Sequence, residues 1–444
     1  MDRKDVEDKR RMMEEMPVGR LLWKMAGPSV IGVMAYNLYN VFDTAFVSRG
    51  AGADAVGGVA VSFPLFLFLS AVSSTLGSGA ASVISRALGE QDREKAAGAA
   101  ANTFLMFYTT AVLITVFGLI CLDELLHFMG VTDTLLPYAK AYTRIILLGA
   151  VTSTGFSNLI RAEGNSRYAM YIWVIPMGAN IVIDCTLIFV LKMGVIGAAI
   201  GTVAGQAVSM AMSIWFFYLS GKSVHHFRLR HFKPDPRLMW EVIGIGIPSF
   251  LQLSGQSVSM IVVNQFLRRY GGDLALSSYG IAYKIVVFFL FPLQGLSQGL
   301  QPVIGYNKGA GRRRRVRQAV RTASAAAGVY GICAYLITVL FAEIFMKIFT
   351  ADTAVIEMGV HILVIVNSAV LFSGIQSVQT TWFQAEGKKI ISLIMALCGQ
   401  LLCFVPAVWI LSRLYGLEGV WFAFPAAALL SLVLSSVSAV VFEQ

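Results

Sequence analysis

The sequence predicts an all-α, polytopic membrane protein. Its twelve transmembrane helices are expected to form two six-helix lobes related by a pseudo-twofold axis along the membrane normal. Three observations lead to this prediction: an apolar composition, about twelve apolar stretches of membrane-spanning length, and an internal repeat of about 220 residues. Of the 444 residues, 57% are hydrophobic and only 14% are charged, whereas a soluble domain carries roughly 25% charged residues. A chain of this composition cannot hide its apolar surface from water.

The apolar stretches place the helices. A helix that crosses a bilayer needs roughly 20 mainly apolar residues, and short polar segments between such stretches hold most of the charges. None of the stretches shows the alternation of apolar and polar residues that is typical of a transmembrane β-barrel. The expected spans are residues 21–47, 57–81, 97–121, 138–160, 168–191, 194–219, 240–266, 276–302, 318–342, 357–381, 390–411 and 418–441.

The polar segments indicate the domain boundaries and the orientation. We expect an N-terminal segment at 1–20, a first lobe (N-lobe) at 21–219, a basic linker at 220–239 and a second lobe (C-lobe) at 240–441. About 26 Lys and Arg residues lie on the side of the two chain ends, against about 8 on the other side. Because cytoplasmic loops carry the excess of Lys and Arg, both termini are expected in the cytoplasm and the protein in the cytoplasmic (inner) membrane.

The net charge of +10 raises the question of a polyanionic partner. The densest basic run, Arg312 to Arg315, follows an expected span directly. Such a position indicates topology and contact with anionic lipids at the cytoplasmic face, so we expect no nucleic-acid partner. The chain also lacks the HExxH pattern of a zinc peptidase. We expect a monomer without enzymatic activity.

Several short motifs recur at one offset. The motif AGPS at 26–29 corresponds to GIPS at 246–249, and AEG occurs at both 162–164 and 385–387. A constant offset indicates an internal duplication. An even number of helices in each copy keeps both copies in the same orientation, as in transporters whose two lobes enclose a central cavity. A duplicated receptor or membrane enzyme is the alternative.

Polar side chains inside the N-lobe spans are candidates for function, because an ionisable residue there costs at least roughly 2.5–3.5 kcal/mol. Helical spacing places Tyr36, Asn40 and Asp43 on one face of the first span, and Asn180 and Asp184 on one face of the fifth. With Thr202 of the sixth span, these groups offer oxygen ligands for Na⁺, or two acids able to share a proton. Interhelical hydrogen bonding without an ion is the alternative.

The C-lobe carries amides where the N-lobe carries acids. An offset of about 220 from Asp43 reaches Val263 and Asn264, and one of about 222 from Asp184 reaches Pro406. One copy of the repeat is therefore expected to fold without the acids. We expect the N-lobe, which carries them, to be the lobe that couples transport to an ion. Candidates for lining a substrate cavity are polar residues of both lobes, although Gln and Asn also serve as interhelical contacts: Tyr36, Asn40, Gln252, Gln256, Tyr283 and Gln298.

Five stretches together resemble the multidrug and toxic compound extrusion (MATE) family, of the prokaryotic multidrug-pump type. They are YNLYNVFDTAFVSRGAG at 36–52, SRALGEQDREKA at 85–96, RAEGNSR at 161–167, GVIGAAIGT at 194–202 and QPVIGYNKGAG at 301–311. The resemblance covers nearly the whole chain and implies two six-helix lobes in a V shape. It also implies a cation site at the four residues that match the family's set: Asp43, Asn180, Asp184 and Thr202.

The resemblance implies a secondary antiporter. We expect it to export organic, mostly cationic, amphipathic compounds in exchange for H⁺ or Na⁺ by alternating access, with no cofactor beside the coupling ion. The alternative is a flippase for a lipid-linked saccharide or another lipid, which should have a strongly cationic central cavity. The acids of the N-lobe and the single lysine, Lys284, within the C-lobe spans argue against this alternative.

Overall fold

The computed structural model describes the backbone of residues 3–51, 53–129, 131, 135–152, 156–224 and 229–443. Side chains are described for the same residues, apart from 3–6, 128, 229–230, 440, 442–443 and most of 39–64. All regular secondary structure in these ranges is helical, which confirms the predicted all-α class.

The N-lobe follows a short helix, α1 (Arg3–Glu15), that lies outside the bundle. The fourth, fifth and sixth spans of the N-lobe are each composed of more than one helical piece, and the fifth and sixth end in π-helical turns. Its elements are α2 (Val18–Ala51), α3 (Ala53–Gly89), α4 (Arg93–Ile120), α5 (Leu122–Phe128), α6 (Leu136–Leu148), η1 (Gly149–Thr152), α7 (Phe156–Ala162), α8 (Ser166–Asp184), η2 (Cys185–Val190), α9 (Gly194–Ile214) and η3 (Trp215–Leu219).

The C-lobe begins after the linker, which contains η4 (Leu229–Phe232). Asp235 caps the first C-lobe helix, since its carboxylate accepts hydrogen bonds from the backbone N–H groups of Arg237 and Leu238. The helices are α10 (Pro236–Tyr270), α11 (Gly272–Gly309), α12 (Arg313–Phe349), α13 (Thr353–Asn367), α14 (Val370–Ala385), α15 (Lys389–Leu397), η5 (Cys398–Leu402), α16 (Phe404–Tyr415) and α17 (Leu417–Glu443).

The helices correspond to the predicted spans. Among the described residues, 11 helical segments are long and apolar enough to cross a membrane, and α2 supplies the twelfth span. Several helices are longer than predicted, as in α11, which covers 272–309 where 276–302 was expected. Large apolar side chains on the outer helices are exposed at helical spacing, as at Val329, Ile332 and Leu336 of α12. This pattern suits contact with lipid.

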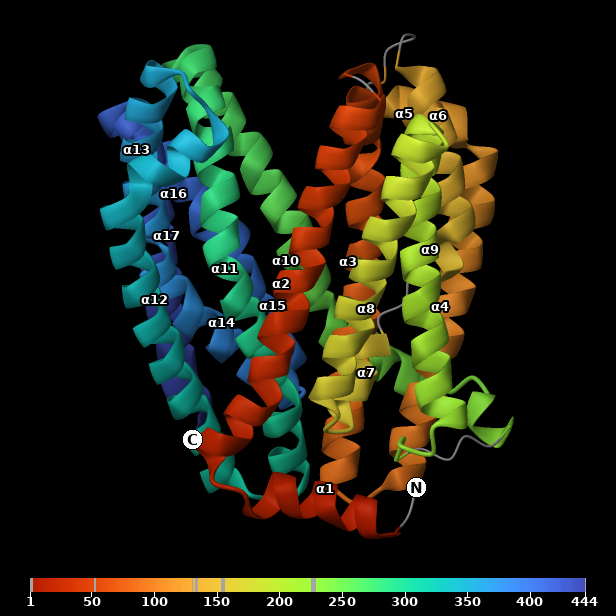
Figure 1. Ribbon diagram of the computed structural model, residues 1–444. Coiled ribbons are helices and arrows are strands. Elements are labelled where there is room, and N and C mark those ends of the chain that lie inside the picture. Colours follow the sequence, from red (N-terminus) through yellow and green to blue (C-terminus); the bar gives the residue numbers. More distant parts are fainter. Residues whose placement is uncertain are drawn as a thin grey trace.

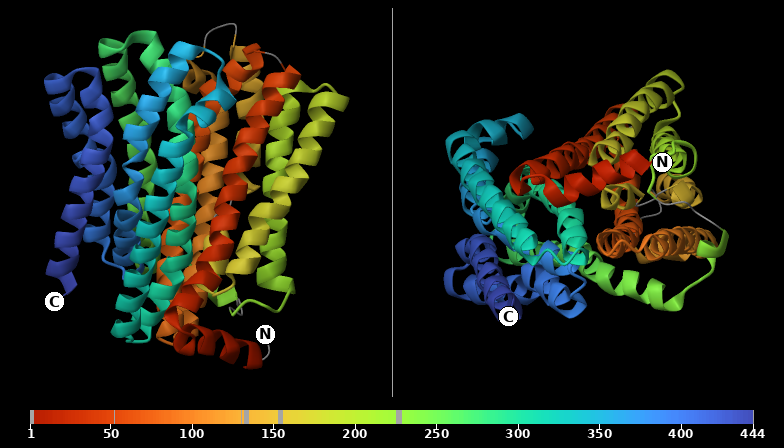
Figure 2. Two further views of the ribbon diagram at one scale, coloured as in Figure 1. Left: turned by 60° about the vertical axis from the view of Figure 1, so that its left-hand side comes forward. Right: turned by 90° about the horizontal axis from the view of Figure 1, so that it is seen from below.

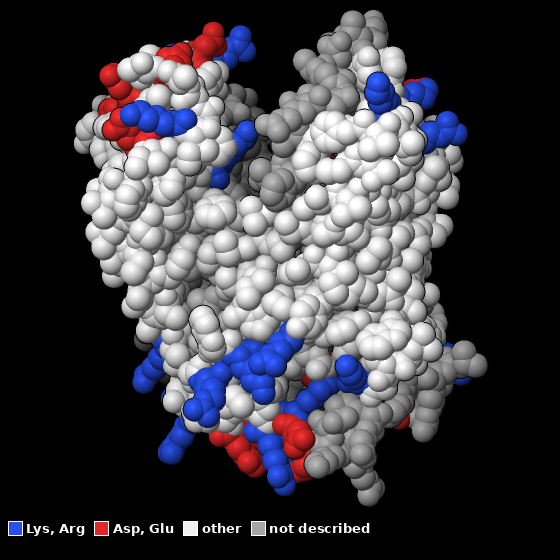
Figure 3. Space-filling view, in the orientation of Figure 1, with Lys and Arg blue, Asp and Glu red and all other residues white. Residues whose placement is uncertain are grey.

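The two lobes diverge in a V. Figure 1 shows them close together at the end where α1 lies, which we call the α1 end, and apart at the opposite end. Figure 2 shows the same division from two other directions. In the space-filling view of Figure 3, charged residues gather at both ends, Lys and Arg mainly at the α1 end, and leave an apolar band between them. The surface is hollowed between the lobes opposite the α1 end.

Glycines allow the lobes to touch backbone to backbone. The helix pairs with the most extensive contacts between the lobes are α2 with α11, α3 with α10, and α3 with α11. A Cβ added at Gly89 would overlap the carbonyl oxygen of Tyr306, and one added at Gly309 would overlap that of Arg86. Both the glycines and their partners are about 220 residues apart, so the two contacts are related by the internal repeat. Small residues permit such close packing in membranes.

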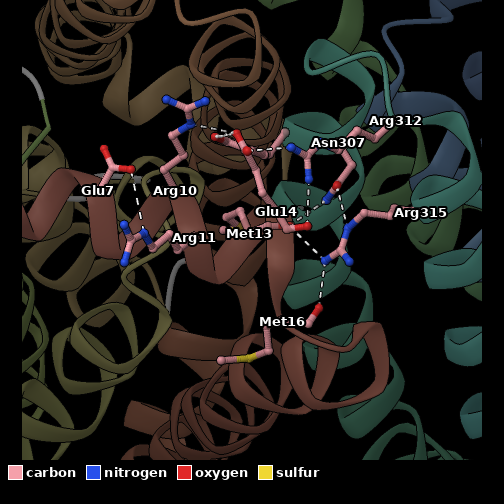
Figure 4. Close-up of polar contacts among 10 residues, drawn as sticks. Glu7, Arg10, Arg11, Met13, Glu14, Met16, Asn307, Arg312 and Arg315 are labelled. Atoms are coloured by element: carbon pink, nitrogen blue, oxygen red, sulfur yellow. Dashed lines mark hydrogen bonds and ion pairs between the residues drawn. The ribbon is translucent and has the colours of Figure 1, made fainter.

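Helix α1 is attached to the C-lobe by a cluster of hydrogen bonds (Figure 4). The carboxylate of Glu14, whose side chain is 9% exposed, accepts hydrogen bonds from Arg10 Nε at 3.1 Å, Arg312 Nη2 at 2.6 Å and Tyr306 Oη at 3.0 Å. Burial alone would raise the pKa of this carboxyl group. The hydrogen bonds and the two positive charges outweigh burial, so the pKa of Glu14 is below its ordinary value.

Helix α1 and the residue that follows it contact both lobes. On the C-lobe side, Arg315 donates to the backbone oxygens of Met13 and Met16 at 3.0 and 2.8 Å. Met13 meanwhile lies against Gly164 in the loop between α7 and α8, and Lys9 Nζ donates to the backbone oxygen of Lys222 at the start of the linker. Helix α1 therefore bridges the two lobes where they are closest.

A substitution of Gly309 tests the close contact of α3 and α11. We expect Gly309→Ala to lower the thermal unfolding midpoint of the purified protein, because its Cβ would overlap Arg86 and overpacking costs about 1–3 kcal/mol. Gly280→Ala on the same helix is the control, since a Cβ there has nothing within 4 Å. Equal midpoints for the two variants would contradict the close contact.

The charge of Glu14 should stabilise the docked α1. We expect Glu14→Gln to lower the unfolding midpoint at neutral pH by more than Glu7→Gln, whose exposed pairing with Arg11 at 3.8 Å is worth at most about 1 kcal/mol. A lowered pKa means that the contribution of Glu14 is complete above the ordinary carboxyl pKa and is lost as the pH falls through the lowered one. The difference between wild type and Glu14→Gln should therefore shrink at acidic pH. A difference that is independent of pH would show that the charge is not involved.

Candidate functional site

The buried carboxyl group of Asp184 is the centre of the candidate cation site. Asp184 ends α8 and is followed directly by the π-helical turn η2, a distortion that is frequent at functional sites. Its side chain is 0% exposed, and within the described part of the chain neither carboxyl oxygen has a hydrogen-bond partner of good geometry, although the Asn180 amide is close enough to interact. Buried polar atoms are normally paired, so the carboxyl group indicates a ligand.

Asn180 and Thr202 are buried beside this carboxyl group. Asn180 lies one turn before Asp184 on α8, and Thr202 lies on α9, which packs along α8. Among the described residues the amide nitrogen of Asn180 also has no partner. Gly201 permits the close approach of α9, because a Cβ at this position would overlap Oδ1 of Asp184 and lie 3.4 Å from Nδ2 of Asn180.

Two further helices complete the site. Asp43 comes from α2, and its Oδ1 is buried without a hydrogen-bond partner in the part of the chain that is described. It is close enough to Asp184 for the two carboxyl groups to interact electrostatically. From α6, the hydroxyl group of Tyr142 hydrogen-bonds the side chain of Thr202 and lies within electrostatic range of both acids. Helices α2, α6, α8 and α9 therefore converge on one point.

The structure brings together the four residues that the sequence singled out and adds Tyr142 and Gly201. The sequence offered weak signals for these two: Tyr142 is a polar residue within the fourth span, and Gly201 belongs to the small-residue stretch GVIGAAIGT. Neither signal indicates a partner, since both residues gain their role from packing between helices. The side chain of Asn40 lies outside the described residues.

This donor set suits a small cation. Carboxylate, amide and hydroxyl oxygens are hard ligands of the kind that Na⁺ prefers, and two neighbouring acids can equally hold a proton. A carboxylate that is buried without a countercharge is strongly disfavoured. The arrangement can therefore hold one positive charge in the N-lobe, as H⁺ or as a metal cation.

A separate cavity of about 340 Å³ lies mostly in the C-lobe. Four of the predicted cavity residues line it: Gln252, Gln256, Tyr283 and Gln298. Gln256 Nε2 donates to the Tyr283 hydroxyl at 2.8 Å. Tyr36, in contrast, packs within the N-lobe, where its ring meets Trp173 edge-on with centroids 4.6 Å apart. The predicted cavity residues thus belong to two different places.

Three other features of the C-lobe spans that could carry chemistry are explained by their place in the structure. Lys284 is exposed and is not part of the cavity lining, and His361 Nε2 pairs with Glu418 at 2.9 Å. The sequence GLSQG at 295–299 matches the GxSxG pattern of hydrolases, which requires a turn between a strand and a helix. Here it lies inside α11, and Gly295 and Gly299 contact α2.

Comparison with known protein families matches residues 28–186 and 248–410 to the MatE family. Among similar curated proteins is the multidrug export protein MepA of Staphylococcus haemolyticus (strain JCSC1435), 28% identical over 92% of this chain and 90% of that protein. MepA of Staphylococcus aureus (strain MRSA252) is 26% identical, with the same coverage.

The fold agrees with this family. A solved structure described as the outward-facing conformation of a multidrug resistance MATE family transporter of the MOP superfamily superimposes with a TM-score of 0.91. The match covers 96% of this chain and 95% of that one at 24% sequence identity, and it shows the likeness of the two-lobed fold. With two family segments that cover most of both lobes, the chain belongs to the MatE family of multidrug and toxic compound extrusion transporters.

Proposed function

We propose that the protein is a secondary antiporter of the cytoplasmic membrane that exports amphipathic organic compounds, organic cations among them, in exchange for H⁺ or Na⁺. The coupling ion binds at Asp43, Asn180, Asp184 and Thr202. The observation that carries this proposal is the fully buried Asp184 carboxyl group without a partner in the described part of the chain. The similar proteins that are named as multidrug export proteins support export as the direction of transport.

Helix α2 links the ion site to the interface between the lobes. It carries Asp43 near one end, while its other half packs against α11 of the C-lobe. A Cβ at Gly295 or Gly299 of α11 would overlap the backbone of α2. Pro28 lies within the contact with α11, between Ala26 and Val30, and removes one backbone hydrogen bond. A change of charge at Asp43 that shifts or bends α2 would therefore act directly on the contact between the lobes.

The proposed cycle follows from this geometry. With the lobes apart opposite the α1 end, the shape suits an outward-facing state whose α1 end faces the cytoplasm, as the basic residues there favour. An ion that enters from outside neutralises the acids and stabilises the conformation that releases cargo. Ion and cargo are then linked through their differential affinity for the two states.

A lipid-linked saccharide is a poorer candidate for the cargo. Its pyrophosphate needs a cationic wall, and the C-lobe cavity has no Lys or Arg among its described lining residues. The curated relatives are likewise named as multidrug export proteins.

Neutralising either acid should abolish coupled export. We expect Asp43→Asn and Asp184→Asn to reduce transport of a fluorescent organic cation into everted vesicles at least about tenfold, because neither amide can take up the coupling charge. Separate pH and Na⁺ gradients identify the ion. Asp123→Asn is the control, since Asp123 forms only an exposed ion pair with Lys140 at 2.7 Å. Normal transport by both site variants would refute the coupling site.

Gly201 provides a test that leaves the acids in place. We expect Gly201→Ala to impair transport as severely as Asp184→Asn, because the new Cβ would displace the Asp184 carboxyl group. Gly178→Ala on α8 has open space around its Cβ and should transport normally. If Gly201→Ala is folded and fully active, Asp184 does not face α9 as described.

A further inference from the structure

The C-lobe cavity differs from the N-lobe site in having no ionisable lining. Its described lining residues include no Asp, Glu, Lys, Arg or His. The polar part of the wall consists of glutamine, serine, threonine, asparagine and tyrosine side chains, and Phe404 and Phe424 contribute aromatic surface. The volume, about 340 Å³, is at the lower end of the range of small-molecule sites, roughly 300–1,000 Å³.

Several of the cavity amides are available to a ligand. Gln301 and Gln384 are occupied by contacts between the lobes, with the backbone oxygen and the hydroxyl group of Ser78 respectively. The side chains of Gln252 and Gln298, in contrast, make no hydrogen bond to any described part of the chain. An amide offers both donor and acceptor atoms without a net charge. The wall can thus satisfy a polar solute, but it has no anion to compensate an organic cation.

One wall of the cavity comes from the N-lobe, and an amide side chain in this wall is held in an orientation that makes it a hydrogen-bond donor. Asn158 of α7 lines the cavity, and its Oδ1 accepts a hydrogen bond from Arg161 Nη2 at 2.5 Å. Because a guanidinium group has only donors, it must face the oxygen of the amide. The NH₂ group of Asn158 is therefore the group left for the cavity. Arg161 acts here as a positioning residue.

Arg161 also sets the sign of the potential behind this wall. Its side chain is 2% exposed, and its Nη1 has no hydrogen-bond partner within the described residues. The nearby acid Glu163 is bound elsewhere, to the hydroxyl group of Ser223 and the backbone N–H of Val224. A buried cation beside the cavity repels a cationic solute and attracts the negative end of a dipole.

We propose that the C-lobe cavity binds uncharged compounds in which a strong hydrogen-bond acceptor, such as a carbonyl or phosphoryl oxygen, is flanked by aromatic groups. The acceptor faces Asn158 and the free glutamines, and the aromatic groups pack against the phenylalanine and tyrosine rings. That these compounds are exported rests on the proposed function. Their binding does not, because it needs neither an ion gradient nor the N-lobe acids.

Two probes built from phenyl groups on phosphorus distinguish an uncharged acceptor from a cation. Triphenylphosphine oxide is uncharged and carries a strong phosphoryl acceptor, whereas tetraphenylphosphonium is a cation without an acceptor. We expect calorimetric titration of the purified protein, without any gradient, to show tighter binding of the phosphine oxide. Tighter binding of the phosphonium ion to wild type would overturn the proposal.

Gln298 tests the charge of the wall. Gln298→Leu should weaken binding of the phosphine oxide by about fivefold, the value of one net hydrogen bond. Gln298→Glu should reverse the preference towards the phosphonium ion. The matched controls are Gln318→Leu and Gln318→Glu, since Gln318 is exposed on α12 outside the cavity. Equal effects of the substitutions at both positions would place the bound probe elsewhere and overturn the proposal.

Asn158→Asp tests the donor and its positioning residue without leaving a buried charge unpaired. The new carboxylate pairs with Arg161, so thermal stability should be kept or increased, while the NH₂ donor is lost and the phosphine oxide binds more weakly. A stable Asn158→Asp variant with unchanged affinity would refute the role of Asn158. If the binding results hold but the Asp43 and Asp184 variants still transport, the coupling proposal fails and this cavity assignment stands.

Discussion

A carboxyl group that is buried in apolar surroundings must be protonated or paired with a cation, and this constraint governs the N-lobe. At Asp184 the folded chain supplies a neighbouring acid, an amide and a hydroxyl group, but the described residues supply no positive charge. Such a site is stable only when a bound proton or metal cation compensates its negative charge. In the proposed antiporter, the packing of the N-lobe would thereby depend on an external cation, which is what coupling requires.

The internal repeat separates what the fold needs from what the function needs. Features that occur in both halves, such as the glycine contacts at Gly89 and Gly309, hold the lobes together. Features that occur in one half only differ in chemistry: carboxyl groups in the N-lobe, and amides around the C-lobe cavity. A duplicated framework has thus acquired one charged and one uncharged polar interior, and we assign the coupling ion to the first and the uncharged compounds among the cargo to the second.

Much of this could be predicted from the sequence, because the bilayer imposes strict local rules. Span lengths follow from hydropathy, and spacing of four placed Asn180 and Asp184 on one face of α8. The residues that the sequence did not reveal depend on contacts between distant segments. Tyr142 and Gly201 gain their roles only when α6 and α9 meet α8, and the attachment of α1 depends on Arg312 and Arg315, about 300 residues away. Tyr36 shares its helix with Asp43 but packs on Trp173. Helical periodicity alone cannot predict which neighbouring helix a side chain contacts.

Separate sites in the two lobes require that their states be communicated through the interface between them. At the α1 end that interface is made of backbone contacts at glycines, reinforced by the Arg86–Glu241 ion pair at 3.0 Å and by α1. Helices in backbone contact cannot slide past each other without losing that contact, but they can change their crossing angle about it. Rotation about these contacts would close the hollow at the far end while the lobes stay joined. To open the α1 end, the protein must in addition release α1, because this helix is bound to both sides. In the proposed cycle, the energy supplied by the ion must therefore cover the undocking of α1 as well as the movement of the lobes.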